Sequence, residues 1–238
     1  MSSLGFSQQD GREIVLQRVQ RALSAASAVL GVRETQLPVQ PGPRNRKALI
    51  AEFRKEWEAL QGKFISMPRA DAVMRIAALL RELNVRRLLT WNEEHLPVRD
   101  LAMGLERSGL KLEGSVLPRR DPARHARLQQ LADIEVGMTG VAAVISQVGA
   151  LVIPGGPGHG RLASLLPPIH IALITPDVIF PTFAAWLEYQ SKAGAVDELL
   201  SSSSSLTLIA GPSRTSDIER VLTLGVHGPA QVLAVLLE

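Results

Sequence analysis

Short apolar runs alternate with stretches of helical spacing along most of this chain. Segments of strand length are predicted at 85–91 and 112–117, short apolar strands at 150–153, 170–175, 206–210 and 232–237, and a further short apolar run at 64–67. Apolar residues at helical spacing predict helices at 72–83, 96–108, 122–132, 141–147 and 181–191, the last with Pro181 at its first position. Strands that alternate with helices form a mostly parallel sheet with helices on both faces, so we expect an α/β fold.

The N-terminal part of the chain has a different pattern. Apolar residues recur at helical spacing over residues 15–30 and again over residues 49–60. A linker that contains Pro and Gly, residues 37–43, separates these two predicted helices. We therefore expect a helical arm over residues 1–62 and one α/β domain over residues 63–238.

The 238 residues include no cysteine. This excludes disulfides, thiolate nucleophiles and cysteine-ligated zinc or iron–sulfur sites from this chain. The five histidines do not follow metal-binding spacings, so we expect neither a metal nor a cofactor bound by this chain. The first ten residues are polar, and no uninterrupted apolar span of about 20 residues follows them. We therefore expect a cytoplasmic protein without an integral membrane segment.

The formal net charge of +3 is unevenly distributed. Basic residues exceed acidic ones in the first 127 residues, but they are mixed with acidic residues and accompany no groove-reading motif or aromatic platform. We therefore expect no nucleic-acid partner. The last 111 residues contain four basic side chains, which are Arg161, Lys192, Arg214 and Arg220. Two of these four, Arg161 and Arg214, lie in loops that are candidate ligand sites.

The first candidate loop, residues 154–161, is rich in glycine and ends in Arg161. Gly158 and Gly160 would let the backbone approach a ligand, and a guanidinium can pair with an anion in a bidentate manner. The loop matches neither a P-loop nor a dinucleotide fingerprint. A surface turn would need the same glycines, so both interpretations stay open.

The second candidate loop, residues 211–217, follows a predicted strand and precedes a predicted helix. A helix N-terminus at this place could bind an anion through free N–H groups, together with Ser213, Arg214 and Asp217. A capping box from Ser216 to Glu219 is the structural alternative. The five consecutive serines just before this strand, residues 201–205, predict a flexible linker.

Two histidines also have a structural and a functional interpretation. His170 opens a predicted strand, where a histidine bonded to the backbone is the usual case, and its functional interpretation is a catalytic base. His227 lies in a predicted tight turn and could stabilise that turn or project into a ligand cleft.

Three stretches taken together resemble the LUD-domain family of lactate utilization proteins. They are residues 137–145, residues 158–171 and residues 211–219, and the last stretch is followed by the turn at 225–229. The resemblance implies a fold similar to that of the sugar-phosphate isomerase and CoA-transferase group. It also implies an accessory subunit of a system that oxidises L-lactate to pyruvate, with the iron–sulfur clusters in partner subunits.

The two candidate loops, each with a lone arginine in an acidic half of the chain, predict a site for a small carboxylate or phosphate, and no catalytic residue is assigned. The expected ligand-binding residues are Thr139, Gly140, Gly158, Gly160, Arg161, His170, Ser213, Arg214, Asp217 and His227. Ala142 and Gln147 stand where the family carries acidic residues, and glutamine cannot act as a general base. An assisting rather than catalytic subunit is therefore expected. The alternative is a stand-alone isomerase or CoA-transferase-like enzyme, with His170 or His227 as its base.

Overall fold

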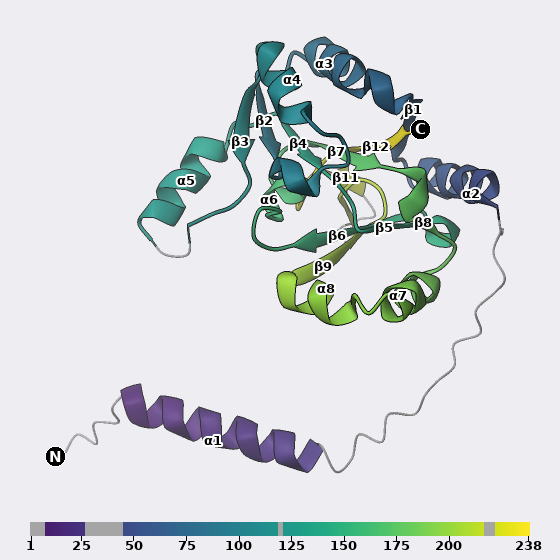
Figure 1. The fold of residues 1–238 in the computed structure, drawn as a ribbon. Helices are drawn as coiled ribbons and strands as arrows, with labels where there is room; N and C mark the ends of the chain where they lie inside the picture. The colour runs from purple at the N-terminus through teal and green to yellow at the C-terminus, as the bar shows by residue number, and fades with distance from the viewer. Residues whose placement is uncertain (1–7, 27–44, 119–120, 217–221) are drawn as a thin grey trace. The chain divides into compact units, whose positions relative to one another are not determined.

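The computed structural model describes residues 8–26, 45–118, 121–216 and 222–238, which belong to two compact units, Met1–Pro38 and Val39–Glu238 (Figure 1). The first unit contains helix α1 (Gln8–Ala26). Val15 and Val19, on the predicted apolar stripe of this helix, are exposed. Among the described helices, none combines the length and apolar character that crossing a bilayer requires.

The second unit is built on a six-stranded sheet in which every pair of neighbours is parallel. In spatial order, its strands are β1 (Lys63–Met67), β12 (Gln231–Leu237), β7 (Ile169–Ile174), β4 (Val136–Thr139), β2 (Arg87–Thr90) and β3 (Lys111–Gly114). The predicted α/β fold is thus confirmed. Strand β4 has no counterpart among the predicted strands, because it has only four residues and Gly137 lowers its strand propensity.

Four helices of the second unit bury apolar residues in the core that includes this sheet. They are α2 (Arg46–Ala59), α3 (Ala72–Glu82), α4 (Leu101–Arg107) and α6 (Leu162–Leu165). Helix α5 (Ala123–Leu131) is mostly exposed and buries only Leu131. Helix α2 begins after Asn45, whose side chain accepts a hydrogen bond from the Ala48 amide, and it buries Phe53 and Trp57 in the main core. Trp57 also donates to the Lys63 carbonyl at 2.9 Å, so α2 is fixed to the first strand.

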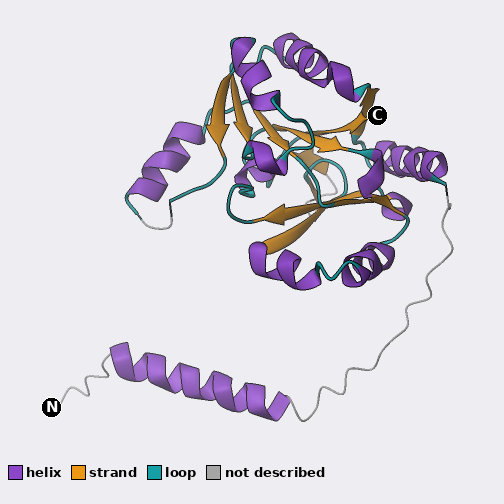
Figure 2. Ribbon diagram, viewed as in Figure 1, coloured by secondary structure: helices purple, strands orange, loops and turns teal. Residues whose placement is uncertain are grey.

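A second, four-stranded mixed sheet forms another layer (Figure 2). In spatial order, it contains β8 (Ile179–Phe180), β5 (Ala143–Ile145), β6 (Ala150–Gly155) and β9 (Ser205–Ile209). Leu151 of β6 packs into the main core, whereas its neighbour Val152 packs in a smaller cluster with Trp186 of α7 (Phe183–Lys192). Strand β6 is therefore buried on both faces, whereas Leu208 of β9 is exposed. The runs at 150–153 and 206–210 are strands as predicted, but they lie outside the parallel sheet.

Three local predictions are wrong. The helix expected at 141–147 is strand β5 followed by the 3₁₀ turn Ser146–Val148, because a short apolar run does not distinguish a buried strand from a helix. Pro181 precedes α7 rather than opening it, since Thr182 is the N-cap. The serine run is no flexible linker: α8 (Val196–Ser202) contains its first part, and Ser204 Oγ donates to the Gly155 carbonyl at 2.9 Å.

The remaining elements are short. Strands β10 (Arg214–Ser216) and β11 (Leu222–Leu224) pair in an antiparallel manner, and 3₁₀ turns occur at Arg69–Asp71, Glu93–His95 and Pro176–Val178. Arg214 thus lies on a strand, and the helix expected to begin beside it is not found over residues 214–216 or 222–224. The predicted boundary at residue 62 between an arm and the α/β domain stays a prediction.

Candidate functional site

Strands β2 and β4 lie at the point where the strand connections of the parallel sheet reverse direction. The next strand of this sheet after β2 is β3, on one side, whereas the next after β4 is β7, on the other side, reached by way of β5 and β6 of the second sheet. Parallel sheets bind ligands at such a reversal, outside the carboxyl ends of the strands. The segment that follows β2 contains Trp91, Asn92 and His95, and Gly140 follows β4.

The glycine-rich loop after β6 reaches this edge of the sheet from the second sheet. The Asn92 amide donates to the Gly158 carbonyl at 2.8 Å, and Trp91 Nε1 donates to the Gly160 carbonyl at 3.1 Å. The Gly160 amide donates to Ser115 Oγ at 3.1 Å, just after the end of β3. The loop is therefore fixed over the carboxyl ends of β2 and β3, although it follows a strand of the other sheet.

Two glycines of this loop permit close packing against the protein itself. Gly158 has a φ of +74°, and a β-carbon there would lie 2.8 Å from His95 Nε2. A β-carbon at Gly160 would overlap the Ser115 carbonyl oxygen. Glycine at both positions is thus required by the docking of the loop onto neighbouring segments.

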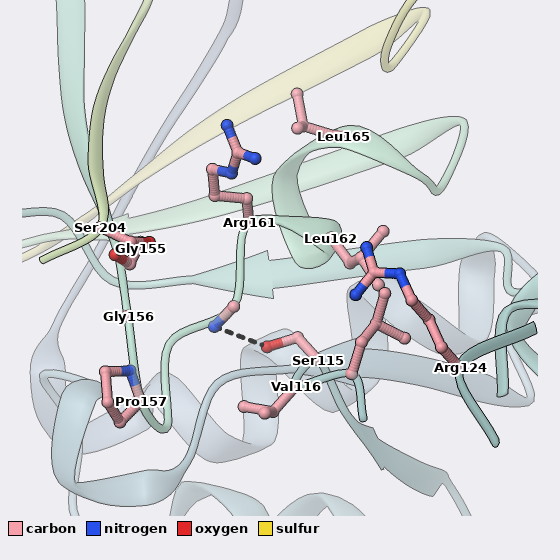
Figure 3. Close-up of a pocket in the computed structure, with 12 residues that line it drawn as sticks. Ser115, Val116, Arg124, Gly155, Gly156, Pro157, Arg161, Leu162, Leu165 and Ser204 are labelled. Carbon is pink, nitrogen blue, oxygen red and sulfur yellow. Dashed lines mark hydrogen bonds between the residues drawn. The ribbon is translucent and has the colours of Figure 1, made fainter. Parts of the chain in front are cut away.

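Beside the docked loop lies an open cavity of about 480 Å³ (Figure 3). Arg161 and Arg124 line it, and none of its lining residues carries a carboxylate. The other lining residues are Ser115, Val116, Leu117, Gly155, Gly156, Pro157, Gly160, Leu162, Leu165 and Ser204. Two cations against a polar and apolar wall make the cavity suited to an anion.

The Arg161 side chain is held at its base, whereas its charged end has no acidic partner among the described residues. Its aliphatic stem lies so close to Gly155 that a β-carbon there would be 2.6 Å from Arg161 Cγ. The described ion pairs do not include Arg161, and Asp177, one possible acidic partner, is also absent from them. Asp217 and Glu219 lie outside the described residues.

Thr139 and His170 form a buried pair inside the parallel sheet. Both side chains are fully buried, and Thr139 Oγ1 lies 2.9 Å from His170 Nε2, while His170 Nδ1 has no hydrogen-bond partner. Burial lowers the pKa of His170 to about 3, so the ring is neutral near pH 7. Gly140 follows this pair and lines a smaller cavity of about 180 Å³ together with His95.

The predicted residues of the second loop gather around the β10–β11 hairpin. The Ser213 amide donates to the Pro229 carbonyl at 2.9 Å, and the His227 amide donates to Ser213 Oγ at 3.3 Å. His227 is exposed, and Arg214, also exposed, does not line the 480 Å³ cavity. Asp217 lies outside the described residues. The structure therefore brings Gly158, Gly160 and Arg161 together and joins Ser213 to His227.

Sequence reasoning missed four residues near the glycine-rich loop. Ser115 and Arg124 line the main cavity, and His159 Nδ1 lies 3.2 Å from His95 Nε2, with the two ring centres 4.3 Å apart. Burial, and secondarily the nearby His95, lower the pKa of His159. His159 stands within the predicted loop, but no spacing in the sequence connects it with His95. No group of three potential metal ligands exists among the described residues.

A separate charged cluster, the Glu113 cluster, lies on strands β2 and β3 and helix α5. The nearly buried Glu113 carboxylate pairs with Arg87 at 3.3 Å, Lys111 at 3.0 Å and Arg127 at 3.0 Å. Burial alone would raise the pKa of Glu113, but hydrogen bonds from these three cations outweigh burial and lower it. These cations are therefore occupied by a protein carboxylate, in contrast to Arg161.

Ala142 and Gln147, which are expected to replace acidic residues of the family, lie at the two ends of β5. Ala142 is half-buried beside the second sheet, where its amide donates to the Val152 carbonyl at 2.9 Å. Gln147 is exposed, and its amide donates to the Pro181 carbonyl at 3.2 Å.

Comparisons with known proteins agree with this architecture. Residues 50–237 match the model of the LUD domain. The chain is 30% identical to lactate utilization protein C of Halalkalibacterium halodurans over 162 residues, which span 67% of this chain and 66% of that protein. It is 28% identical to lactate utilization protein C of Deinococcus radiodurans over 212 residues, 88% of this chain and 90% of that protein.

A crystal structure of a DUF162 family protein from Deinococcus radiodurans has a similar fold. The TM-score is 0.55 at 22% identity, and the match covers 82% of this chain and all of that one. The LUD-domain match covers both sheets, the glycine-rich loop and the cavity beside it. The chain therefore belongs to the LUD-domain family.

Proposed function

We propose that this protein is a component of lactate utilization that binds a small carboxylate in the cavity formed by Arg124 and Arg161. The observation that carries the proposal is the charge of this cavity, which two guanidinium groups line without a carboxylate. A guanidinium pairs with a carboxylate through two parallel hydrogen bonds, and it stays charged at every physiological pH. The names of the relatives connect such proteins with lactate, a small carboxylate.

The walls of the cavity supply further interactions for such an anion. Ser115, beside Gly160, carries a hydroxyl group that can form a hydrogen bond with a second polar group of the ligand and so orient it. Leu162 and Leu165 provide apolar surface for a short carbon chain. The phosphate alternative fits the same two cations, so the ligand series below includes inorganic phosphate.

We further propose that the protein acts as an accessory subunit beside iron–sulfur partners that oxidise L-lactate to pyruvate. A chain without cysteine cannot ligate such clusters through thiolates, so the electron-carrying centres of this system would lie in other subunits. The two sheets of the second unit would then correspond to the sugar-phosphate isomerase and CoA-transferase architecture. Superposition on proteins of that group tests this last point.

Anion binding is tested by calorimetric titration of the full chain with L-lactate, pyruvate and phosphate, with neutral L-lactamide as the control ligand. Arg161→Gln and Arg124→Gln should each weaken binding of the preferred anion by roughly tenfold or more, because each removes a charge-assisted hydrogen bond. Arg214→Gln is the matched control, since Arg214 does not line the cavity. Equal binding by lactate and lactamide, or equal losses in all three variants, would contradict the proposed site.

The subunit role is tested separately in cells. The full chain, carrying an affinity tag, should co-purify with iron–sulfur proteins from cells grown on lactate, and deletion of its gene should impair that growth. Complementation with the Arg161→Gln variant separates ligand binding from assembly, because this exposed substitution leaves the buried core unchanged. Absence of both co-purification and a growth defect would refute the accessory role.

A further inference from the structure

Two histidine rings connect the glycine-rich loop to the segment that follows β2. His159 Nδ1 lies 3.2 Å from His95 Nε2, although the residues are 64 positions apart. His159 is 7% exposed, and its ring packs against the Trp91 ring in a T-shaped arrangement with a centroid distance of 5.5 Å. The contact therefore lies inside the interface between the loop and the sheet.

This contact depends on protonation. A hydrogen bond between two ring nitrogens requires one of them to donate and the other to accept, so at least one ring must be neutral. When both rings are protonated, neither nitrogen can accept, and two positive charges face each other at short distance. Desolvation of His159 in the docked loop opposes its protonation further.

The charged groups around the pair do not compensate for a charge on His159. The exposed Glu94 carboxylate lies 3.8 Å from His95 Nε2 and can pair with a protonated His95. No acidic side chain pairs with His159 among the described ion pairs, and Arg161 is only two residues further along the chain. Trp91 and Ser115 are uncharged. A positive charge is therefore less favourable on His159 than on His95.

The same loop carries one of the two cations of the proposed anion site. Gly156, Pro157 and Gly160 line the 480 Å³ cavity on either side of His159, and Arg161 follows directly. We propose that the His95–His159 pair is a pH-sensitive latch that positions this loop, and with it Arg161, for anion binding. The part that concerns affinity rests on the proposed function, whereas loop docking can be measured without any ligand.

The direction of the pH effect follows from the preference of the docked loop for a neutral His159. The docked loop is favoured above the ordinary histidine pKa of 6.5 and loses this preference as the pH falls below it. Affinity for an anion should therefore decrease on acidification. A histidine that simply attracted the anion would produce the opposite trend, because protonation would add a positive charge beside the site.

Pyruvate is a suitable probe, because it stays ionised between pH 8 and 5.5. Its affinity for the wild-type full chain should fall about fivefold over this range, the loss that one ordinary hydrogen bond accounts for. His159→Asn retains a polar atom near the position of Nδ1 but cannot titrate, so its affinity should be nearly independent of pH. His125→Gln and His227→Gln are the controls and should retain the wild-type pH dependence. Wild-type affinity that is constant or higher at pH 5.5, or a His159→Asn variant with the wild-type pH profile, would overturn the latch.

Hydrogen exchange gives a readout that is independent of the ligand. The amides of Asn92 and Gly160, which bond to Gly158 and Ser115, should exchange faster at pH 5.5 than at pH 8 after correction for intrinsic rates. The acceleration should be absent in His159→Asn. If L-lactate, pyruvate and phosphate all fail to bind but the exchange result holds, the proposed anion site fails and the latch stands. Unchanged protection of these amides refutes the latch itself.

Discussion

Replacement of Gly160 with alanine should destabilise the protein by about 2 kcal/mol. A β-carbon at this position would overlap the Ser115 carbonyl oxygen, so the loop must move away from the segment that follows β3. This movement breaks the hydrogen bond from the Gly160 amide to Ser115 Oγ and the one from Trp91 Nε1 to the Gly160 carbonyl. Each contributes about 1 kcal/mol net, and the buried Trp91 finds little water as a substitute partner.

Thermal unfolding followed by circular dichroism measures this loss. For a chain of this size, about 2 kcal/mol corresponds to a Tm lowered by about 4–8 °C. Gly114→Ala is the matched control, because this exposed glycine ends β3 beside Ser115 and a β-carbon there meets no atom within 4 Å. If the two variants unfold at the same temperature, the loop is not held by the contacts described, and the reasoning is refuted.

Three further predictions concern the rest of the molecule. Glu113→Gln should lower the free energy of unfolding by about 2 kcal/mol at pH 7, measured with urea, because the three cations of the Glu113 cluster lose a nearly buried carboxylate. Since its pKa is lowered, the wild-type advantage should be present above the ordinary value of 4.5 and disappear as the pH falls below it; an advantage that persists in acid contradicts this origin. The ring resonances of His170 in NMR spectra, assigned with His170→Gln, should stay unchanged from pH 8 to 5, because its pKa is about 3, and a shift near neutrality would show that the ring is not sealed in the sheet. Removal of residues 1–44 should preserve cooperative unfolding of the second unit, whereas removal of residues 1–62 should abolish it by exposing the partners of Phe53 and Trp57; cooperative unfolding of both fragments would place the boundary at residue 62.

The alternation of apolar runs and helical stripes was sufficient to predict the α/β class. It could not assign strands to sheets, because β6 and β9 are as short and apolar as the strands of the parallel sheet. Sheet membership depends on long-range pairs such as Leu151 with Ile209, which no local pattern encodes. The same limitation explains the wrong helix at 141–147, where burial on both faces removes any polar alternation.

The candidate site was partly accessible from the sequence. A lone arginine at the end of a glycine-rich loop drew attention to Arg161, which does line a cavity. Arg124 lies 37 positions earlier, in a segment rich in other arginines, so composition could not single it out. The pairing of His95 with His159 likewise depends on how two loops meet above the sheet edge. Such contacts are properties of the topology rather than of residue spacing.

The pairing of the first strand of the parallel sheet with its last strand has a consequence for folding. Lys63 of β1 lies opposite Leu233 of β12, so β1 acquires its neighbour only after about 170 further residues have been synthesised. Until then, the apolar side chains of β1 and the open flank of β7 are available to other chains. Assembly of this sheet should therefore be slow and sensitive to protein concentration during refolding, and a chaperone that shields residues 63–67 during translation should raise the yield of native protein.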